Sequence, residues 1–190
     1  MFVFSFSIIS FIMARIIAIS GHMGSGKSTA AQYFKEFLPE YKVVSFASRL
    51  KEAVSILLGL PLETFYTPEG KNLTIDSLGI TVRQFMQKFG TEAIQSTFGS
   101  DFWVNLLLKD FGEDSKIIID DLRFEHEIQG ILKRCNNSIL IRINRDNKTS
   151  SHVSESELDN YSKFTYVYDN NDSPEDLRLF VKSVICTFNT

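Results

Sequence analysis

A glycine-rich segment near the start of the chain has the residue types of a phosphate-binding loop. Residues 21–28 read GHMGSGKS and fit the pattern GxxxxGK[ST] without a mismatch, after an apolar run and before a segment of helical period. Glycines let successive backbone N–H groups converge on phosphates, and the positive end of the following helix points to the same place. The residues that we expect to bind the phosphates of ATP are Gly21, Met23, Gly24, Ser25, Gly26, Lys27, Ser28 and Thr29.

Two residues of this loop have distinct chemical roles. In this pattern the lysine, here Lys27, reaches the β- and γ-phosphates, and the hydroxyl of Ser28 can ligate Mg²⁺. A chance match in a turn rich in glycine and serine is the competing explanation. The strand expected before the loop and the helix expected after it argue against chance.

An acidic pair follows a second apolar run. Asp120 and Asp121 come directly after three isoleucines. An acid at the carboxyl end of a parallel strand points into the crevice where ligands of open α/β sheets bind, and there it can hold a metal-bound water or orient an acceptor. Alternatively, one of the two caps the helix expected from Phe124. We expect one functional and one structural acid, with Ser28 and Asp120 holding the metal.

A polar stripe lies beside a core-facing stripe in residues 81–96. Arg83, Gln87 and Thr91 recur every four residues, on a different face from the apolar residues of the same segment. An arginine can bind a monophosphate through two hydrogen bonds, and a glutamine amide can pair with the edge of a base. A solvated helix face is the simpler explanation, which the spacing alone favours.

Arg123 and Trp103 allow two interpretations each. Arg123 can bind the acceptor phosphate, or it can form with Glu127 an exposed pair worth roughly 0.2–0.5 kcal/mol. Trp103 can stack on a base or pack in the core. Residues 145–163 form a polar stretch that can serve as a lid, in which Arg145, with Arg142 just before it, could neutralise charge on the transferred phosphoryl group. His152 in that stretch is more simply a surface residue.

Apolar runs of β type alternate with segments of helical period along the chain. This alternation predicts an α/β fold with a five-stranded parallel sheet flanked by helices. An irregular excursion is expected at residues 61–79, and residues 13–190 are expected to form one domain. The predicted strands cover residues 15–20, 42–46, 116–120, 138–143 and 165–168. The predicted helices cover residues 27–38, 47–58, 81–96, 101–111, 124–134 and 174–188.

Composition limits the partners. The 190 residues carry a net charge of -3, with 44% hydrophobic and 23% charged residues, so no global charge recruits the chain to nucleic acid or an anionic membrane. Cys135 and Cys186 form no metal-binding pattern and are expected to be buried free thiols. Residues 1–12 carry no charge. They fit neither a signal peptide nor a spanning helix, and are treated as an apolar extension of uncertain status.

These motifs, in this order, resemble the deoxynucleoside monophosphate kinases of bacteriophages and large DNA viruses. The resemblance extends over nearly all of the chain from Met13 onward, and the ordered set is much more specific than the phosphate-binding loop alone. Besides that loop, the set comprises Phe46-Ala47 with Leu50-Lys51, Gln87 with Gly90-Thr91-Glu92, Asp101-Phe102-Trp103, Asp121-Leu122-Arg123-Phe124 with Glu127, and His152 with Ser154-Glu155.

The resemblance implies a nucleoside monophosphate kinase-like P-loop fold, with ATP and Mg²⁺ as cofactors and in-line transfer of the γ-phosphoryl group to a deoxynucleoside monophosphate. The residues that it implies for the acceptor are Asp121, Arg123 and Glu127, with Lys51, Arg83 and Gln87 as weaker candidates. The catalytic residues expected are Lys27, Asp121, Arg123 and the lid residue Arg145. The chain departs from the family at Ser48-Arg49, where a small or acidic residue followed by proline is expected, which leaves the substrate preference open.

Two further functions stay open. A kinase of the same architecture could act on phosphomevalonate or dephospho-coenzyme A, and a non-catalytic module could bind or sense ATP. The expected partners are small molecules, not nucleic acid or a membrane. A homodimer stays open for the assembly. The expected location is the cytoplasm, which is the host's if the chain is viral.

Overall fold

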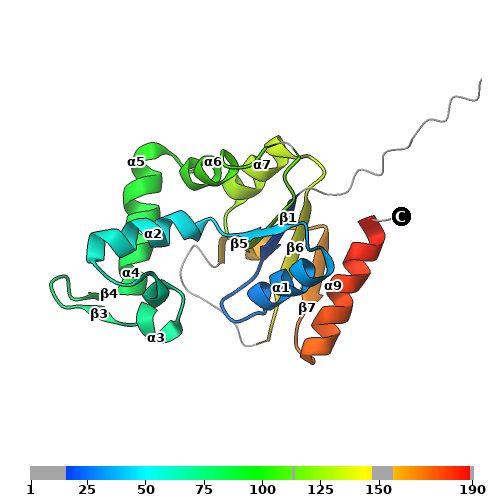
Figure 1. The fold of residues 1–190 in the computed structure, drawn as a ribbon, viewed down its shortest axis with the longest axis horizontal. Helices are drawn as coiled ribbons and strands as arrows, with labels where there is room; N and C mark the ends of the chain where they lie inside the picture. Colours follow the sequence, from blue (N-terminus) through cyan, green and yellow to red (C-terminus); the bar gives the residue numbers. More distant parts are fainter. Residues whose placement is uncertain (1–15, 113, 147–155, 189–190) are drawn as a thin grey trace, which may run out of the picture.

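The computed structural model describes residues 16–112, 114–146 and 156–188, and its centre is a five-stranded sheet (Figure 1). The strand order is β2-β5-β1-β6-β7, and every neighbouring pair is parallel. The strands are β1 (Ile16–Ser20), β2 (Lys42–Val44), β5 (Ile117–Leu122), β6 (Ile139–Asn144) and β7 (Tyr166–Asp169). The predicted five-stranded parallel sheet is therefore confirmed, with strand ends displaced by no more than two residues.

Helices cover both faces of this sheet, which explains why its central strand is entirely buried. Alternate residues of a strand point to opposite faces. Ile17 and Ile19 of β1 pack with α1 (Lys27–Phe37) and α9 (Pro174–Phe188) in one core cluster. Ile16 and Ala18 pack with α6 (Phe102–Leu108) and α7 (Glu125–Arg134) in the other.

A third, smaller core lies outside the sheet. It centres on Val54, Phe65 and Val82, each fully buried. Figure 1 shows the elements that carry these residues, in cyan to green, to one side of the five-stranded sheet. The elements are α2 (Ala47–Leu58), η1 (Leu62–Phe65), α3 (Pro68–Lys71), β3 (Thr74–Ile75), β4 (Ile80–Thr81) and α4 (Val82–Gln87).

The excursion predicted at residues 61–79 is thus more regular than expected. Strands β3 and β4 form an antiparallel hairpin. The side chain of Thr67 caps α3 by accepting a hydrogen bond from the Gly70 backbone N–H (3.0 Å), and Pro68 follows at the first helical position. Turn residues therefore start a helix here instead of marking an irregular loop.

The helix predicted over residues 81–96 is not a continuous α-helix. Thr81 and Gln84 form a capping box at the start of α4. After Gln87 the chain continues as the π-helix η2 (Lys88–Gln95) and ends in α5 (Ser96–Phe98). Gly90 lies in this stretch, where its carbonyl accepts a hydrogen bond from Trp103 Nε1 (3.1 Å). A Cβ atom at Gly90 would lie 2.8 Å from Leu50 Cδ2, so the absence of a side chain lets η2 approach α2 closely.

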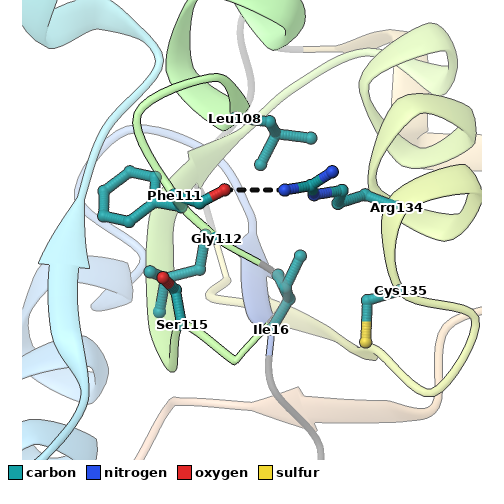
Figure 2. A pocket seen from close by; sticks show the side chains of 8 residues that line it. Ile16, Leu108, Phe111, Gly112, Ser115, Arg134 and Cys135 are labelled. Carbon is teal, nitrogen blue, oxygen red and sulfur yellow. Dashed lines mark hydrogen bonds between the residues drawn. The ribbon is translucent and has the colours of Figure 1, made fainter.

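A small hollow lies at the amino ends of β1 and β5, lined by Ile16 and Ile117. Figure 2 shows Arg134 donating a hydrogen bond to the Phe111 carbonyl across it (2.7 Å), with Cys135 nearby. Cys135 and Cys186 are both free thiols, as expected, but the expectation that they are buried is wrong, because Cys135 is half-buried and Cys186 is exposed. Across the described parts of the chain, no helix has the length and apolar character needed to cross a membrane. The predicted extension 1–12 and His152, Ser154 and Glu155 of the lid lie outside the described residues.

Candidate active site

The loop between β1 and α1 has a backbone that requires glycine at two positions. Gly26 has φ 107°, in the left-handed region, and a Cβ atom there would lie 2.4 Å from Asn170 Nδ2. A Cβ atom on Gly21, with φ 150°, would lie 2.1 Å from the carbonyl oxygen of Ile143. Both distances are far below van der Waals contact, so the glycines allow the loop to fold against β6 and the chain after β7.

Polar groups of the loop are arranged to receive anionic oxygens. Lys27 Nζ donates to the carbonyls of Gly21 (2.6 Å) and His22 (2.8 Å), so the ammonium group lies across the loop. The hydroxyl of Ser25 is buried and has no hydrogen-bond partner among the described residues. An unsatisfied buried polar group costs about 1–3 kcal/mol, which a phosphate oxygen at the site would relieve. The loop therefore fits the phosphates of a nucleoside triphosphate.

Asn170, a residue not predicted from the sequence, supports the loop from behind. It directly follows β7, is buried, and donates from Nδ2 to the Ser25 carbonyl (2.8 Å). Its only sequence signal was a polar residue at the carboxyl end of a strand. That signal is shared by Asp169 and Asn171, which are both exposed.

The two adjacent acids of β5 are directed to different neighbours. A register shift places two residues of β5 opposite one of β1, between the pairs Ala18–Ile119 and Ser20–Leu122. Such a bulge re-aims side chains beside functional sites. It allows Asp120 to approach the loop and Asp121 to approach the start of α2, both from the carboxyl edge of the sheet.

Asp120 lies beside the phosphate-binding loop. Its Oδ2 accepts a hydrogen bond from the Ser28 hydroxyl (3.3 Å). Burial, together with the charge of Asp121, raises the pKa of Asp120 to about 6. Among the described residues there is no cluster of three or more His, Cys, Asp or Glu side chains able to hold a metal. Mg²⁺ typically binds through one or two carboxylates, waters and substrate phosphates.

Asp121 anchors the start of α2. Its carboxylate accepts hydrogen bonds from the Ser45 hydroxyl (2.7 Å), the Phe46 N–H (2.8 Å) and the Ala47 N–H (3.0 Å). The expectation that one acid caps the helix after Phe124 is wrong, because the acid caps α2 instead. The backbone N–H groups of Phe46 and Ala47, two residues of the motif set, are thus the groups that Asp121 binds.

A cavity of about 410 Å³ at the carboxyl ends of the strands lies between the loop and the smaller third core. It is lined by residues from both sides. Those predicted from sequence are Met23, Gly24, Lys27, Ser28, Lys51, Arg83, Gln87, Asp120, Asp121, Arg123 and Glu127. Of the remaining predicted residues, Gly21, Ser25 and Gly26 belong to the loop and Thr29 to α1, and none of these four lines the cavity. Arg145 is exposed beyond the end of β6 and does not line it either.

Several basic residues line this cavity in addition to Lys27. Arg83 extends toward the loop, where its Nη1 lies 3.5 Å from Met23 Sδ. Lys51 Nζ lies 3.9 Å from the centre of the Tyr66 ring, and burial lowers the pKa of this lysine. Arg123 lines the same cavity beyond β5. Tyr66 and Lys71 also line the cavity, and neither was predicted from the sequence because the 61–79 segment carries no periodic pattern.

Glu127 does not form the exposed pair with Arg123 that the spacing allowed. It is 3% exposed, and its Oε2 accepts from the backbone N–H groups of Arg123 (2.7 Å) and Phe124 (3.0 Å). Burial, with the nearby charge of Asp121, raises the pKa of Glu127 to about 8, while the two N–H groups oppose this rise. Glu127 therefore caps α7 and fixes the turn that carries Arg123.

Trp103 both packs in the core and borders the site. It is buried and lines the cavity, and its indole N–H donates to the Gly90 carbonyl. The interpretation of Trp103 as a core residue is therefore confirmed, and stacking on a base stays a prediction.

Arg142 is a structural residue, so the prediction that placed it with the lid is wrong. It is buried within β6 and donates to Ser20 Oγ (3.1 Å), Asn144 Oδ1 (3.1 Å) and Asp159. Asp159 also lies 2.9 Å from His22 Nε2 of the loop. Arg142 thus helps to hold Asp159 beside the phosphate-binding loop.

The fold and this site define a P-loop kinase, an enzyme that transfers a phosphoryl group. The family model for deoxynucleotide monophosphate kinases matches residues 63–181, more than half of the chain. The chain therefore belongs to the deoxynucleotide monophosphate kinase family. The match begins after the phosphate-binding loop, so it rests on elements of the third core and on the strands β5 to β7, independently of the loop motif. No curated protein is significantly similar in sequence.

Solved kinase structures resemble this chain at low sequence identity. A gluconokinase from Sinorhizobium meliloti 1021 has the same fold, with 10% identity and a TM-score of 0.51, covering 92% of this chain and 93% of that chain. A dephospho-CoA kinase from Campylobacter jejuni is 16% identical with a TM-score of 0.49, and the match covers 93% of this chain and 98% of that chain. A shikimate kinase from Aquifex aeolicus vf5 is 17% identical with a TM-score of 0.48, and the match covers 92% of this chain and 96% of that chain.

Proposed function

We propose that this chain transfers the γ-phosphoryl group of ATP to a deoxynucleoside monophosphate. The observation that carries the proposal is a cavity lined by Lys27 and Ser28 on one side and by Arg83 and Arg123 on the other. A phosphate-binding loop facing basic residues suits two phosphorylated substrates. Membership of the deoxynucleotide monophosphate kinase family supports the choice of acceptor.

On the donor side, the backbone of the loop and Lys27 would hold the triphosphate, with the Ser25 hydroxyl donating to a phosphate oxygen. Ser28 and Asp120 would hold Mg²⁺, which neutralises negative charge on the β- and γ-phosphates when bound. Asp121 keeps the start of α2 in place through three hydrogen bonds and so orients Lys51 on that helix. These contacts of Asp121 are structural, and a direct role in transfer stays a prediction.

On the acceptor side, Arg83 and Arg123 would bind the monophosphate, with Lys51 adding positive charge. Phosphoryl transfer depends mainly on positioning and electrostatics, so these cations would align the acceptor oxygen with the γ-phosphorus. Glu127 would act through the backbone of Arg123, and Gln87 would contact the nucleoside. Arg145 would approach only on closure of the lid and would help to exclude water.

The test is ADP formation by the full chain with ATP, Mg²⁺ and one acceptor at a time. The panel contains dGMP, dTMP, dCMP, dAMP, the matching ribonucleotides, phosphomevalonate and dephospho-coenzyme A. ADP formation that depends on one or more deoxynucleotides supports the proposal. ADP formation only with a compound outside the nucleotides overturns the acceptor, and ATP binding without any acceptor-dependent ADP overturns the proposed activity.

A further inference from the structure

One wall of the cavity is a stripe of four polar residues spaced by four positions. Arg83, Gln87, Thr91 and Gln95 all line the cavity. In an α-helix of 3.6 residues per turn, positions spaced by four drift steadily around the axis. The π-helix η2 forms i→i+5 hydrogen bonds and takes more residues per turn, so it reverses that drift. Gln95 therefore stays on the cavity face, where a regular α-helix would turn it away.

The two ends of this stripe face different surroundings. Arg83 lies at the end next to the phosphate-binding loop, 3.5 Å from Met23 Sδ. Gln95 lies at the far end, with Trp103 also on the cavity wall and His126 in contact. A nucleotide that directs its phosphate toward the loop would therefore direct its base toward Gln95.

The contacts of Gln95 define which way its amide faces. Its Nε2 donates to the Ser100 carbonyl (3.4 Å) and lies 3.4 Å from His126 Nε2. A carbonyl can only accept, so the amide nitrogen must be on this side, and His126 Nε2 must then accept the second hydrogen. Both amide hydrogens are used. The oxygen Oε1 has no hydrogen-bond partner among the described residues and is left as an acceptor.

The surroundings of His126 favour the neutral ring that this arrangement needs. Its ring stacks on Phe124, with centroids 5.0 Å apart and planes at 18°. Burial lowers the pKa of His126, while the carboxylates of Glu157 and Asp101 oppose that effect. A neutral imidazole with its proton on Nδ1 can accept from Gln95, whereas the protonated ring cannot.

We propose that Gln95, oriented by His126, reads the acceptor base and selects bases that carry an exocyclic amino group. The oxygen of Gln95 accepts a hydrogen bond from that amino group, and His126 is a positioning residue that acts through Gln95. The inference rests on the proposed function and adds the class of base to it. A site built to pair with a donor rejects an analogue that lacks it, because the acceptor in the site is then left unpaired.

The experiment compares matched acceptors that differ by one amino group. The pairs are dGMP with deoxyinosine monophosphate and dCMP with dUMP, and the readout is the ratio of kcat/KM within a pair. This ratio is independent of the fraction of active protein, so partial unfolding of a variant does not affect it. For the full chain we expect a ratio of about tenfold or more in the pair with the better acceptor.

Variants then assign the selectivity to the two residues. Gln95→Leu is expected to bring the ratio close to one, mainly by raising KM for the amino-bearing acceptor. His126→Phe keeps the stacking on Phe124 and is expected to lower the ratio severalfold. His126→Asn retains an acceptor oxygen, so the ratio should stay close to that of the unaltered chain. The control is Gln129→Leu, the same change at an exposed position of α7, which should leave the ratio unchanged.

The outcomes separate this inference from the proposed function. A ratio near one in the unaltered chain, dTMP as the best acceptor, or a ratio unchanged in Gln95→Leu overturns the inference while leaving a deoxynucleotide kinase. Absence of activity with every nucleotide overturns the proposed function and the inference together. A large ratio that collapses in Gln95→Leu and survives in Gln129→Leu supports both.

Discussion

The hydroxyl of Ser28 lies 3.3 Å from the carboxylate of Asp120, although 92 positions separate the two residues in the chain. This contact joins the first turn of α1 to the carboxyl end of β5. It exists because β5 lies next to β1 in the sheet, which places their carboxyl ends side by side. In the proposed function, the Ser28 hydroxyl oxygen and an Asp120 carboxylate oxygen would bind the same Mg²⁺ ion, one from the first turn of α1 and the other from the sheet.

Replacement of Asp120 should therefore weaken the response to the metal. In Asp120→Asn we expect the Mg²⁺ concentration for half-maximal activity to rise by about tenfold or more, because the carboxylate contributes charge that an amide lacks. The measurement is a Mg²⁺ titration of ADP formation at fixed ATP. Asp76→Asn, in the exposed part of the β3–β4 hairpin, is the control. Equal titration curves for Asp120→Asn and the unaltered chain would remove Asp120 from the metal site.

Lys27 should be essential for transfer but not for folding. We expect Lys27→Ala to lower kcat by at least about a hundredfold, since it removes a cation from the developing charge of the phosphoryl group. Circular dichroism and the melting temperature should change little. The same substitution at Lys182, which is exposed on α9, should leave kcat unchanged. Comparable kcat values for the two variants would contradict the role of Lys27.

The two arginines of the acceptor side should affect one substrate only. Arg83→Leu and Arg123→Leu are each expected to raise KM for the acceptor by about tenfold or more, because a charged hydrogen bond to a phosphate contributes about 1.5–3 kcal/mol. KM for ATP should stay nearly constant. Arg178→Leu, which removes an exposed ion pair with Glu36, is the matched control. A rise in KM for ATP alone would place the arginines on the donor side.

Gly26 should tolerate no side chain. Gly26→Ala places a methyl group 2.4 Å from Asn170 Nδ2 in a left-handed conformation, so it must displace the loop. We expect reduced ATP affinity by calorimetry and a lower melting temperature. Gly59→Ala is the control, because Gly59 has φ 64° and open space around an added Cβ atom. This change should cost only about 1–2 kcal/mol of backbone strain without changing ATP affinity. Equal ATP affinity in both variants would show that the close packing at Asn170 does not shape the loop.

Stability should depend on pH through Glu127. The folded-state pKa of about 8 exceeds the ordinary value of 4.5, so the folded chain binds this proton more tightly than the unfolded chain. The resulting stabilisation is complete below pH 4.5 and is lost as the pH rises through about 8. Urea unfolding of the unaltered chain and Glu127→Gln at about pH 5 and about pH 8.5 measures it. We expect the unaltered chain to lose more stability across this range than the variant, and equal losses would contradict the assignment.

Much of the fold was predictable from residue patterns alone. The apolar run of β1 and the glycine pattern after it reflect local requirements, namely burial on both faces and close approach of the backbone to phosphates. The positions of Lys27, Ser28 and Asp120 follow from these elements once the sheet is parallel. The ends of the predicted strands moved by no more than two residues, whereas the helix predicted over residues 81–96 is divided into α4, η2 and α5.

The remainder depended on tertiary contacts that no local pattern encodes. Asp121 binds groups 74 to 76 positions away at the start of α2, and Glu127 is buried instead of paired with Arg123. The π-helix could not be foreseen, because α-helical spacing places Gln95 off the polar stripe. The start of α4, by contrast, was predicted to within one residue, and Gln84 follows Thr81 at capping-box spacing, which is a local signal for it.

Transfer of labelled phosphate tests the central claim most directly. The full chain is incubated with Mg²⁺, ATP that carries a radioactive γ-phosphate and an equimolar mixture of the four deoxynucleoside monophosphates, and the products are separated by chromatography. We predict that label appears in at least one deoxynucleoside diphosphate in an amount equal to the ADP formed, and that Lys27→Ala shows neither. Label found only in inorganic phosphate or remaining in ATP, with every deoxynucleotide unlabelled, would contradict the proposed function.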